Sequence, residues 1–170
     1  MGEAGLFAHE RVELLDGTIV TMCPQNSPHA ATTYQLHRLL MRVLDDTVCV
    51  RAQLPIILDD WSEPEPDVAV CAADPDNYAR EHPTPGRVLL VCEVASSSLA
   101  YDRSAKSSAY AASGIPEYWI IDVERRVVHV LADPERAASR YGRQVAMRDG
   151  DVLRVPGGAT LTVAEVLPRI

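Results

Sequence analysis

Lysine is almost absent from this sequence of 170 residues, in which one lysine, Lys106, accompanies fifteen arginines. The two residues differ chemically, because the lysine ammonium is compact and shifts its pKa readily, whereas the guanidinium stays charged. A single lysine among so many arginines therefore indicates a position that requires an ammonium group. The alternatives are chance survival of one lysine codon and an ordinary solvated helix face.

Long apolar runs are also missing, and none approaches the roughly 20 residues that span a bilayer. The first ten residues lack a basic segment followed by an apolar stretch, so we expect no secretory signal and a cytoplasmic location without a membrane partner. The four cysteines form no C-x-x-C pair, which argues against a zinc ribbon. They are expected to be small buried thiols: Cys23, Cys49, Cys71 and Cys92.

Positive charge is scarce as well, since the formal net charge is −8. This argues against a broad basic surface for nucleic acid, because neutralisation of phosphates supplies most non-specific affinity. It does not exclude a nuclease, since metal ions at an acidic site bring local positive charge.

The expected strands predict a mixed sheet in one domain over residues 1–170. Asp16-Gly17 between two β-branched runs predicts a hairpin. The run 88–94 is apolar except for one carboxylate, which is typical of a strand buried on both faces. Strands are expected at 11–15, 18–22, 48–58, 67–71, 88–94, 117–122, 127–131, 144–147, 152–155 and 160–162.

Helices are expected between these strands. Ser27 and Pro28 predict the N-cap and first position of a helix that ends near residue 44. Asp102 is expected to cap a second helix, which ends before Gly114, and a brief helix is expected from Val163. The fold class is therefore α/β, a mixed sheet flanked by helices.

Glu93 is the most informative carboxylate, because a lone acid inside a buried apolar strand is costly unless it is paired or bound to a metal. Asp67 opens a neighbouring short strand after the rigid Pro66. Adjacent strands lie about 4.8 Å apart, so two such carboxylates can share one cation. Oxygen ligands of this kind suit Mg²⁺ or Mn²⁺. The alternatives are a strand-entry residue for Asp67 and a structural ion pair for Glu93.

Lys106 lies thirteen residues after Glu93 on the next expected helix. Asp102, Lys106 and Tyr110 are spaced by four and therefore share one helical face. If this face packs on the end of the Glu93 strand, the ammonium points at the two carboxylates. It can then orient or deprotonate an attacking water, or stabilise charge on a phosphorane-like transition state.

These residues together resemble the Uma-two family of restriction endonucleases, within the PD-(D/E)xK nuclease superfamily. The resemblance covers nearly the whole chain and implies a restriction-endonuclease-like fold. It is carried by Glu13, Asp16-Gly17, Ser27-Pro28-His29, Gln53, Pro66-Asp67, Glu93-Val94-Ala95-Ser96, Lys106, Tyr110 and 114–119.

The resemblance implies a role for each matching residue. Asp67 and Glu93 would hold the metal with the backbone carbonyl of Val94, and Lys106 would be the catalytic lysine. Many superfamily members carry the lysine two residues after the acid, where this chain has Ala95, and the family pattern moves it to the next helix. Auxiliary metal or substrate contacts are expected from Glu13, His29, Gln53 and Tyr110.

The leading hypothesis is a divalent-metal-dependent endonuclease that cleaves DNA, with a homodimer expected from the resemblance. The first alternative is a catalytically idle nuclease fold that binds protein or nucleic acid, which the charge of −8 favours. The second is a hydrolase of a small phosphoester or nucleotide. For the auxiliary residues the alternatives are an exposed strand position for Glu13, a helix cap for His29, a cross-strand hydrogen bond for Gln53 and packing for Tyr110.

Overall fold

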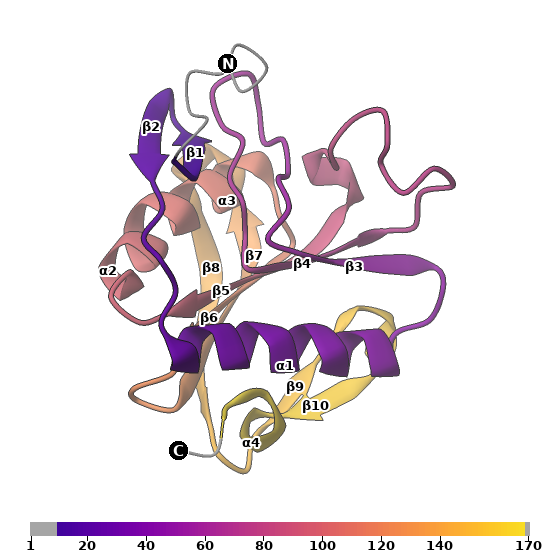
Figure 1. Ribbon diagram of the computed structural model, residues 1–170, viewed down its shortest axis with the longest axis vertical. Helices are drawn as coiled ribbons and strands as arrows, with labels where there is room; N and C mark the ends of the chain where they lie inside the picture. The colour runs from indigo at the N-terminus through magenta and orange to yellow at the C-terminus, as the bar shows by residue number, and fades with distance from the viewer. Residues whose placement is uncertain (1–9, 169–170) are drawn as a thin grey trace.

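A six-stranded mixed sheet forms the centre of the protein in a computed structural model that describes residues 10–168 (Figure 1). The strand order is β3-β4-β5-β6-β7-β8. The β5–β6 pair is parallel and the other neighbours are antiparallel. The strands are β3 (Val48–Ala52), β4 (Val68–Ala72), β5 (Val88–Ala95), β6 (Glu117–Asp122), β7 (Val127–Glu135) and β8 (Arg140–Arg148). The predicted mixed sheet with flanking helices is confirmed.

Two small hairpins and several helices complete the fold. The hairpins are β1 (Val12–Leu15) with β2 (Thr18–Thr21), and β9 (Val152–Arg154) with β10 (Thr160–Thr162). The α-helices are α1 (Ser27–Val43), α2 (Leu99–Tyr101), α3 (Ser107–Ser113) and α4 (Val163–Val166). A π-helical turn, η3 (Asp102–Lys106), joins α2 to α3, and short 3₁₀ turns are η2 (Pro85–Arg87), η4 (Arg136–Ala138) and η5 (Pro156–Gly158).

The sheet separates two hydrophobic cores, because alternate residues of each strand point to opposite faces. On one face α1 packs its buried leucines, Leu36, Leu39 and Leu40, against β5 and the C-terminal hairpin. On the other face α3 packs against the sheet around Tyr110 and Tyr118. Figure 1 shows α1 in front of the sheet, apart from α2, α3 and the β1–β2 hairpin.

Local sequence explains the elements that lead to the functional region. Asp16 and Gly17 have φ values of 47° and 73°, so the Asp-Gly turn adopts the left-handed backbone that a two-residue hairpin requires. Asn26, rather than the predicted Ser27, caps α1, and its side chain accepts a hydrogen bond from the His29 N–H at 3.0 Å. Gly114 ends α3 at φ 81°, as predicted.

Besides the N-cap of α1, three sequence-based predictions of structure were wrong. The expected strand 48–58 ends at Ala52, because Gln53 has a φ of 55° and leaves the extended region. The second helical segment begins at Leu99 rather than after Asp102, which lies inside it at φ −63° and ψ −38°. Cys23 is exposed and Cys49 is half-buried, whereas Cys71 and Cys92 are buried as expected.

The sequence predictions about targeting concern the N-terminal segment and membrane spans. The predicted absence of a secretory signal falls on residues 1–10, of which 1–9 lie outside the described residues. In residues 10–168 no helix is long and apolar enough to cross a membrane.

Candidate active site

The candidate active site is a pocket of about 310 Å³ at the end of β5 where β4 begins. Val68 pairs with Cys92, so Asp67, the residue just before β4, stands beside Glu93 of β5. Both belong to the alternate positions that face α3. The β1–β2 hairpin, the start of α1 and the turn η3 supply the other walls, and the lining includes Glu13, His29, Asp67, Glu93, Val94, Asp102 and Lys106.

Glu93 is buried in the floor of this pocket, with an exposed fraction of 4%. Its Oε1 accepts hydrogen bonds from the Lys106 Nζ and the Tyr110 hydroxyl, both at 2.9 Å. Its Oε2 lies 3.4 Å from the backbone N–H of Asp67. The carboxylate is thus fixed by both the helix and the neighbouring strand, as a ligand held in one orientation must be.

Lys106 enters the pocket from η3. Its Nζ lies 2.9 Å from Glu93 Oε1 and 3.1 Å from Glu13 Oε2, so one ammonium bridges two strands. A π-helical turn is uncommon and frequently occurs at functional sites, because its extra residue redirects the side chains that follow. Here Asp102 and Lys106, the first and last residues of that turn, are both buried and both line the pocket.

Asp67 is held by contacts to one of its two oxygens. Its Oδ2 accepts a hydrogen bond from the Val94 N–H at 2.8 Å and lies 3.1 Å from His29 Nε2. His29 reaches this position because it occupies the first turn of α1, whose start lies beside β5 where Asn26 bonds Ser96. Within residues 10–168, Oδ1 of Asp67 has neither a hydrogen bond nor an ion pair and is left to face the pocket.

Glu13 is a buried member of the site, and the alternative of an exposed strand position was wrong. In β1 its side chain shares a face with Leu15, which is also buried. Besides its contact with Lys106, its Oε2 accepts a hydrogen bond from the Glu65 N–H at 3.3 Å. The hairpin therefore contributes a third carboxylate to the pocket.

Four carboxylates and one ammonium make the site electrostatically unbalanced. Glu13, Asp67, Glu93 and Asp102 are all buried, and Lys106 is the ammonium among them. Burial raises the pKa of Glu93 to about 8, with Lys106 opposing the shift and neighbouring acids adding to it. Burial acts to lower the pKa of Lys106, but Glu93 and Glu13 together outweigh it and raise that pKa, so the ammonium stays charged at neutral pH. An additional cation would relieve the excess negative charge.

Asp102 was predicted as a helix cap on the same helical face as Lys106, and no site role was predicted for Ser98, Tyr101 or Cys23. All four residues line the pocket. Ser98 donates a hydrogen bond to Asp102 Oδ2 at 2.7 Å, and burial raises the pKa of Asp102. The four-residue spacing of Asp102 from Lys106 was the available signal for Asp102. Nothing in the sequence pattern distinguished the other three residues.

Gln53 differs from the other residues carried over by resemblance. Its side chain does not line the pocket. Its backbone N–H instead lies 3.2 Å from the carbonyl oxygens of both Pro66 and Asp67. Gln53 therefore braces the segment that carries Asp67, and the structure gives no contact between its side chain and the site.

The donor set fits a hard divalent cation that takes part of its ligands from backbone and water. Among residues 10–168, no group of three or more His, Cys, Asp or Glu side chains is arranged to hold a metal ion. Asp67 Oδ1 and the Glu93 carboxylate supply two acidic oxygens. In a strand the N–H and C=O of one residue point to the same edge, so the Val94 carbonyl faces Asp67 as its N–H does. Mg²⁺ commonly binds through one or two carboxylates and retains several waters.

Comparison with solved structures supports the fold. A crystal structure titled a putative nuclease belonging to DUF820, from Anabaena variabilis, is similar with a TM-score of 0.70 at 12% sequence identity. The match covers 92% of this chain and 89% of that chain, which shows a shared nuclease-like fold. No curated protein matches this chain.

Comparison with family models identifies the chain by sequence. The model of the Uma2 family, described as "Putative restriction endonuclease", matches residues 6–164. This range includes every residue of the candidate site and almost the whole chain of 170 residues. The protein therefore belongs to the Uma2 family, and the resemblance found in the sequence is confirmed.

Proposed function

We propose that this protein is a divalent-metal-dependent nuclease that hydrolyses phosphodiester bonds of DNA at the pocket formed by Asp67, Glu93 and Lys106. The observation that carries the proposal is the convergence of these side chains from three separate elements in a buried, acid-rich pocket. Such a cluster is costly for folding, because charges removed from water are rarely compensated in full by pairing. A catalytic requirement accounts for that cost.

Asp67, Glu93 and the Val94 carbonyl would hold Mg²⁺ or Mn²⁺. When bound, such an ion polarises a phosphoryl oxygen and lowers the pKa of water. His29 and the Val94 N–H orient Asp67 by contacting its Oδ2, which leaves Oδ1 directed at the pocket. Tyr110 performs the same task for Glu93 by donating to its Oε1.

Lys106 supplies fixed positive charge in this scheme. Its raised pKa keeps it protonated, so it acts by orienting the attacking water and stabilising charge on the phosphoryl oxygens rather than as a general base. The water oxygen attacks phosphorus as the bond to the leaving sugar oxygen breaks. One of the two water protons ends on that sugar oxygen and the other is released to solvent, which gives a phosphate monoester and a hydroxyl group. Glu13 positions Lys106 through a second contact to its Nζ, in addition to that of Glu93.

A plasmid-nicking assay tests the proposal, with EDTA, Mg²⁺ and Mn²⁺ compared for the wild type, Asp67→Asn and Lys106→Ala. We expect cleavage by the wild type with metal only, and a rate at least about 100-fold lower for each variant, since removal of one preorganised electrostatic group costs about 10²–10³ in rate. Asp60→Asn is the matched control, because Asp60 is an exposed acid outside the pocket.

Equal nicking by Lys106→Ala and the wild type would remove Lys106 from the mechanism. DNA binding without cleavage under every metal condition would favour the alternative of an idle binding module. Cleavage of a small phosphodiester but not of DNA would instead favour the small-substrate hydrolase. Sedimentation equilibrium of the wild type with and without DNA tests the expected homodimer, in which two pockets would serve the two strands.

A further inference from the structure

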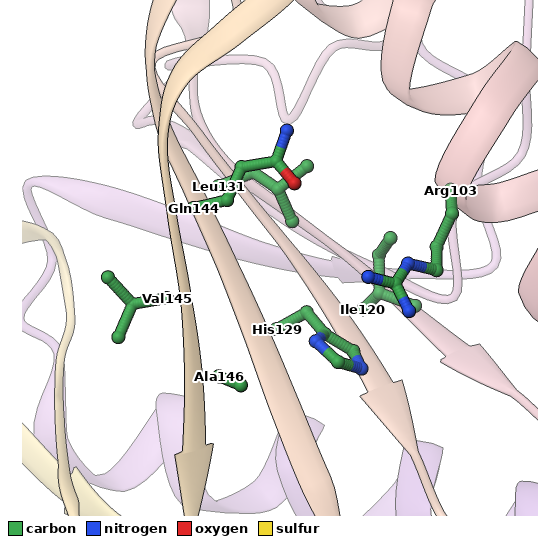
Figure 2. A pocket seen from close by; sticks show the side chains of 7 residues that line it. All are labelled: Arg103, Ile120, His129, Leu131, Gln144, Val145 and Ala146. Atoms are coloured by element: carbon green, nitrogen blue, oxygen red, sulfur yellow. The ribbon is translucent and has the colours of Figure 1, made fainter.

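A second hollow of about 190 Å³ lies on the same face of the sheet as the candidate active site. Figure 2 shows Arg103 extending from its helix toward His129. Gln144 lies on the side of β8 that faces these two residues, and Val145 lies on the other side. The hollow is lined by Arg103, Ile120, His129, Leu131, Gln144, Val145 and Ala146.

The strand register relates this hollow to the catalytic pocket. Glu93 pairs with Ile120, Ile120 pairs with His129, and His129 pairs with Ala146, so the four residues form one row across the sheet. With strands about 4.8 Å apart, His129 lies roughly 10 Å from Glu93. The turn η3 separates the two, since Asp102 lines the pocket and the next residue, Arg103, lines the hollow.

Arg103 is an exposed arginine that is free to bind an anion. Within the described residues it takes part in no salt bridge, whereas two arginines before β7 and two of β8 are all paired with acids, namely Arg125, Arg126, Arg140 and Arg143. Partial burial lowers the pKa of His129, and Arg103 is the charged group that lowers it most. Asp122 opposes this shift, while Arg148 and Arg125 add to it.

The surrounding segment is less acidic than the rest of the chain. Residues 122–151 contain six arginines and six acidic residues, so this segment is neutral while the whole chain carries −8. A neutral region that presents Arg103, unpaired within the described residues, next to an acidic pocket can hold a phosphate in place although the protein as a whole repels a polyanion.

The hollow combines charge with uncharged surface. Ile120 and Leu131 are buried beneath it, and the exposed Gln144 side chain supplies a neutral amide at its rim. A bare inorganic anion would use Arg103 alone. A nucleotide would use all three features, with its phosphate at Arg103 and its base or sugar over the apolar floor near the amide.

We propose that this hollow is a nucleotide subsite, in which Arg103 contacts a backbone phosphate of a DNA strand whose cleaved bond lies in the neighbouring pocket. The inference rests on the proposed function for the identity of its ligand. It assigns nucleic-acid contact to the surface of β6, β7 and β8 beside η3. The residues of these three strands take no part in the catalytic chemistry.

Fluorescence anisotropy with a labelled oligothymidylate in EDTA tests the subsite without any need for cleavage. We expect Arg103→Gln to raise Kd about tenfold and to reduce the salt dependence of log K by about 0.7, the loss of one phosphate contact on a single strand. Arg103→Lys should retain most of the salt dependence. Arg38→Gln is the matched control, because Arg38 is an exposed arginine on α1, on the opposite face of the sheet.

Equal Kd and equal salt dependence for Arg103→Gln and Arg38→Gln would overturn the subsite. Competition separates the two sources of phosphate: the dinucleotide TpT should displace the oligonucleotide at lower concentration than inorganic phosphate does, and equal potency would refute the nucleotide assignment. If the wild type nicks DNA with metal and Arg103→Gln binds DNA as the wild type does, the subsite is refuted but the proposed catalysis stands. If Arg103→Gln weakens DNA binding but the wild type nicks no DNA, the proposed catalysis is refuted but the subsite stands.

Discussion

The two faces of β5 are built from the same apolar strand but enclose very different interiors. Toward α1, Leu90, Cys92 and Val94 pack in a hydrophobic core with the buried leucines of that helix. Toward α3, Glu93 stands among Val91 and Ala95 and is joined by three further carboxylates and Lys106. Both faces therefore contribute a hydrophobic core, but the second gives up stability at one end of the strand. Such a local departure from good packing is expected where function requires it.

The strongest disruption of the charged face should come from Lys106→Met. Without the ammonium, the buried Glu93 and Glu13 carboxyls have no cationic partner and must be protonated to stay in the folded protein. At pH 9, where both are charged in the unfolded chain, we therefore expect a loss of about 3–5 kcal/mol in the free energy of unfolding. Adding Glu93→Gln to this variant should recover part of the loss, because it removes one carboxyl that folding would otherwise have to protonate. Urea denaturation of the single and double variants measures both effects, and simple additivity would contradict the coupling between the two residues.

Leu40→Ala removes packing on the apolar face of β5 without changing the charged face. Leu40 is fully buried, so the cavity should cost about 2–5 kcal/mol of unfolding free energy. The nicking rate per folded molecule should stay at the wild-type level. The cost should also add to that of Glu93→Gln within about 0.5 kcal/mol, because the two side chains lie on opposite faces of the sheet. A large fall in rate at full folding would show that the two faces are not independent.

The charged face should also make stability depend on pH. The pKa of Glu93 rises from 4.5 to about 8 on folding, so between these values the folded state retains a proton that the unfolded state has lost. Stability of the metal-free protein should therefore fall as pH rises from 4.5 to about 8. Denaturation in EDTA across this window should show a smaller decrease for Glu93→Gln, and an identical pH dependence would contradict the assignment.

Thiol accessibility offers a milder comparison of the two regions. Cys23 is exposed and lines the catalytic pocket, whereas Cys71 is buried and its pKa is raised by burial to about 12. Reaction with a disulfide reagent should therefore label Cys23 first and leave Cys71 unreactive in the folded protein. DNA bound in the pocket should slow the labelling of Cys23, and no protection would indicate that DNA binds elsewhere.

The sequence predicted those site residues that differ in type from the residues around them in the chain. Glu93 interrupts an apolar run and Lys106 is the single lysine, so each differs from its background in the amino-acid sequence itself. The hairpin at Asp16-Gly17 and the C-terminal glycine of α3 were predicted because their backbone conformations demand particular residues.

Other features depend on tertiary contacts and left no local signal. Asp102 was interpreted as a helix cap because Asp is a favoured N-cap residue. The helical segment instead begins at Leu99 after Ser98, whose side chain makes no capping bond. Cys23 was expected to be buried on the strength of its residue type alone. The row from Glu93 to His129 depends on strand register, which spacing along the chain cannot determine.

Calorimetric titration with Mn²⁺ tests the central claim most directly, because it asks whether the buried acids form a metal site. The wild type should bind Mn²⁺, Asp67→Asn should lose most of the affinity, and Asp60→Asn should bind as the wild type does. If Asp67→Asn kept the wild-type affinity, or if the wild type bound no Mn²⁺ with or without DNA, the metal-dependent nuclease would be contradicted.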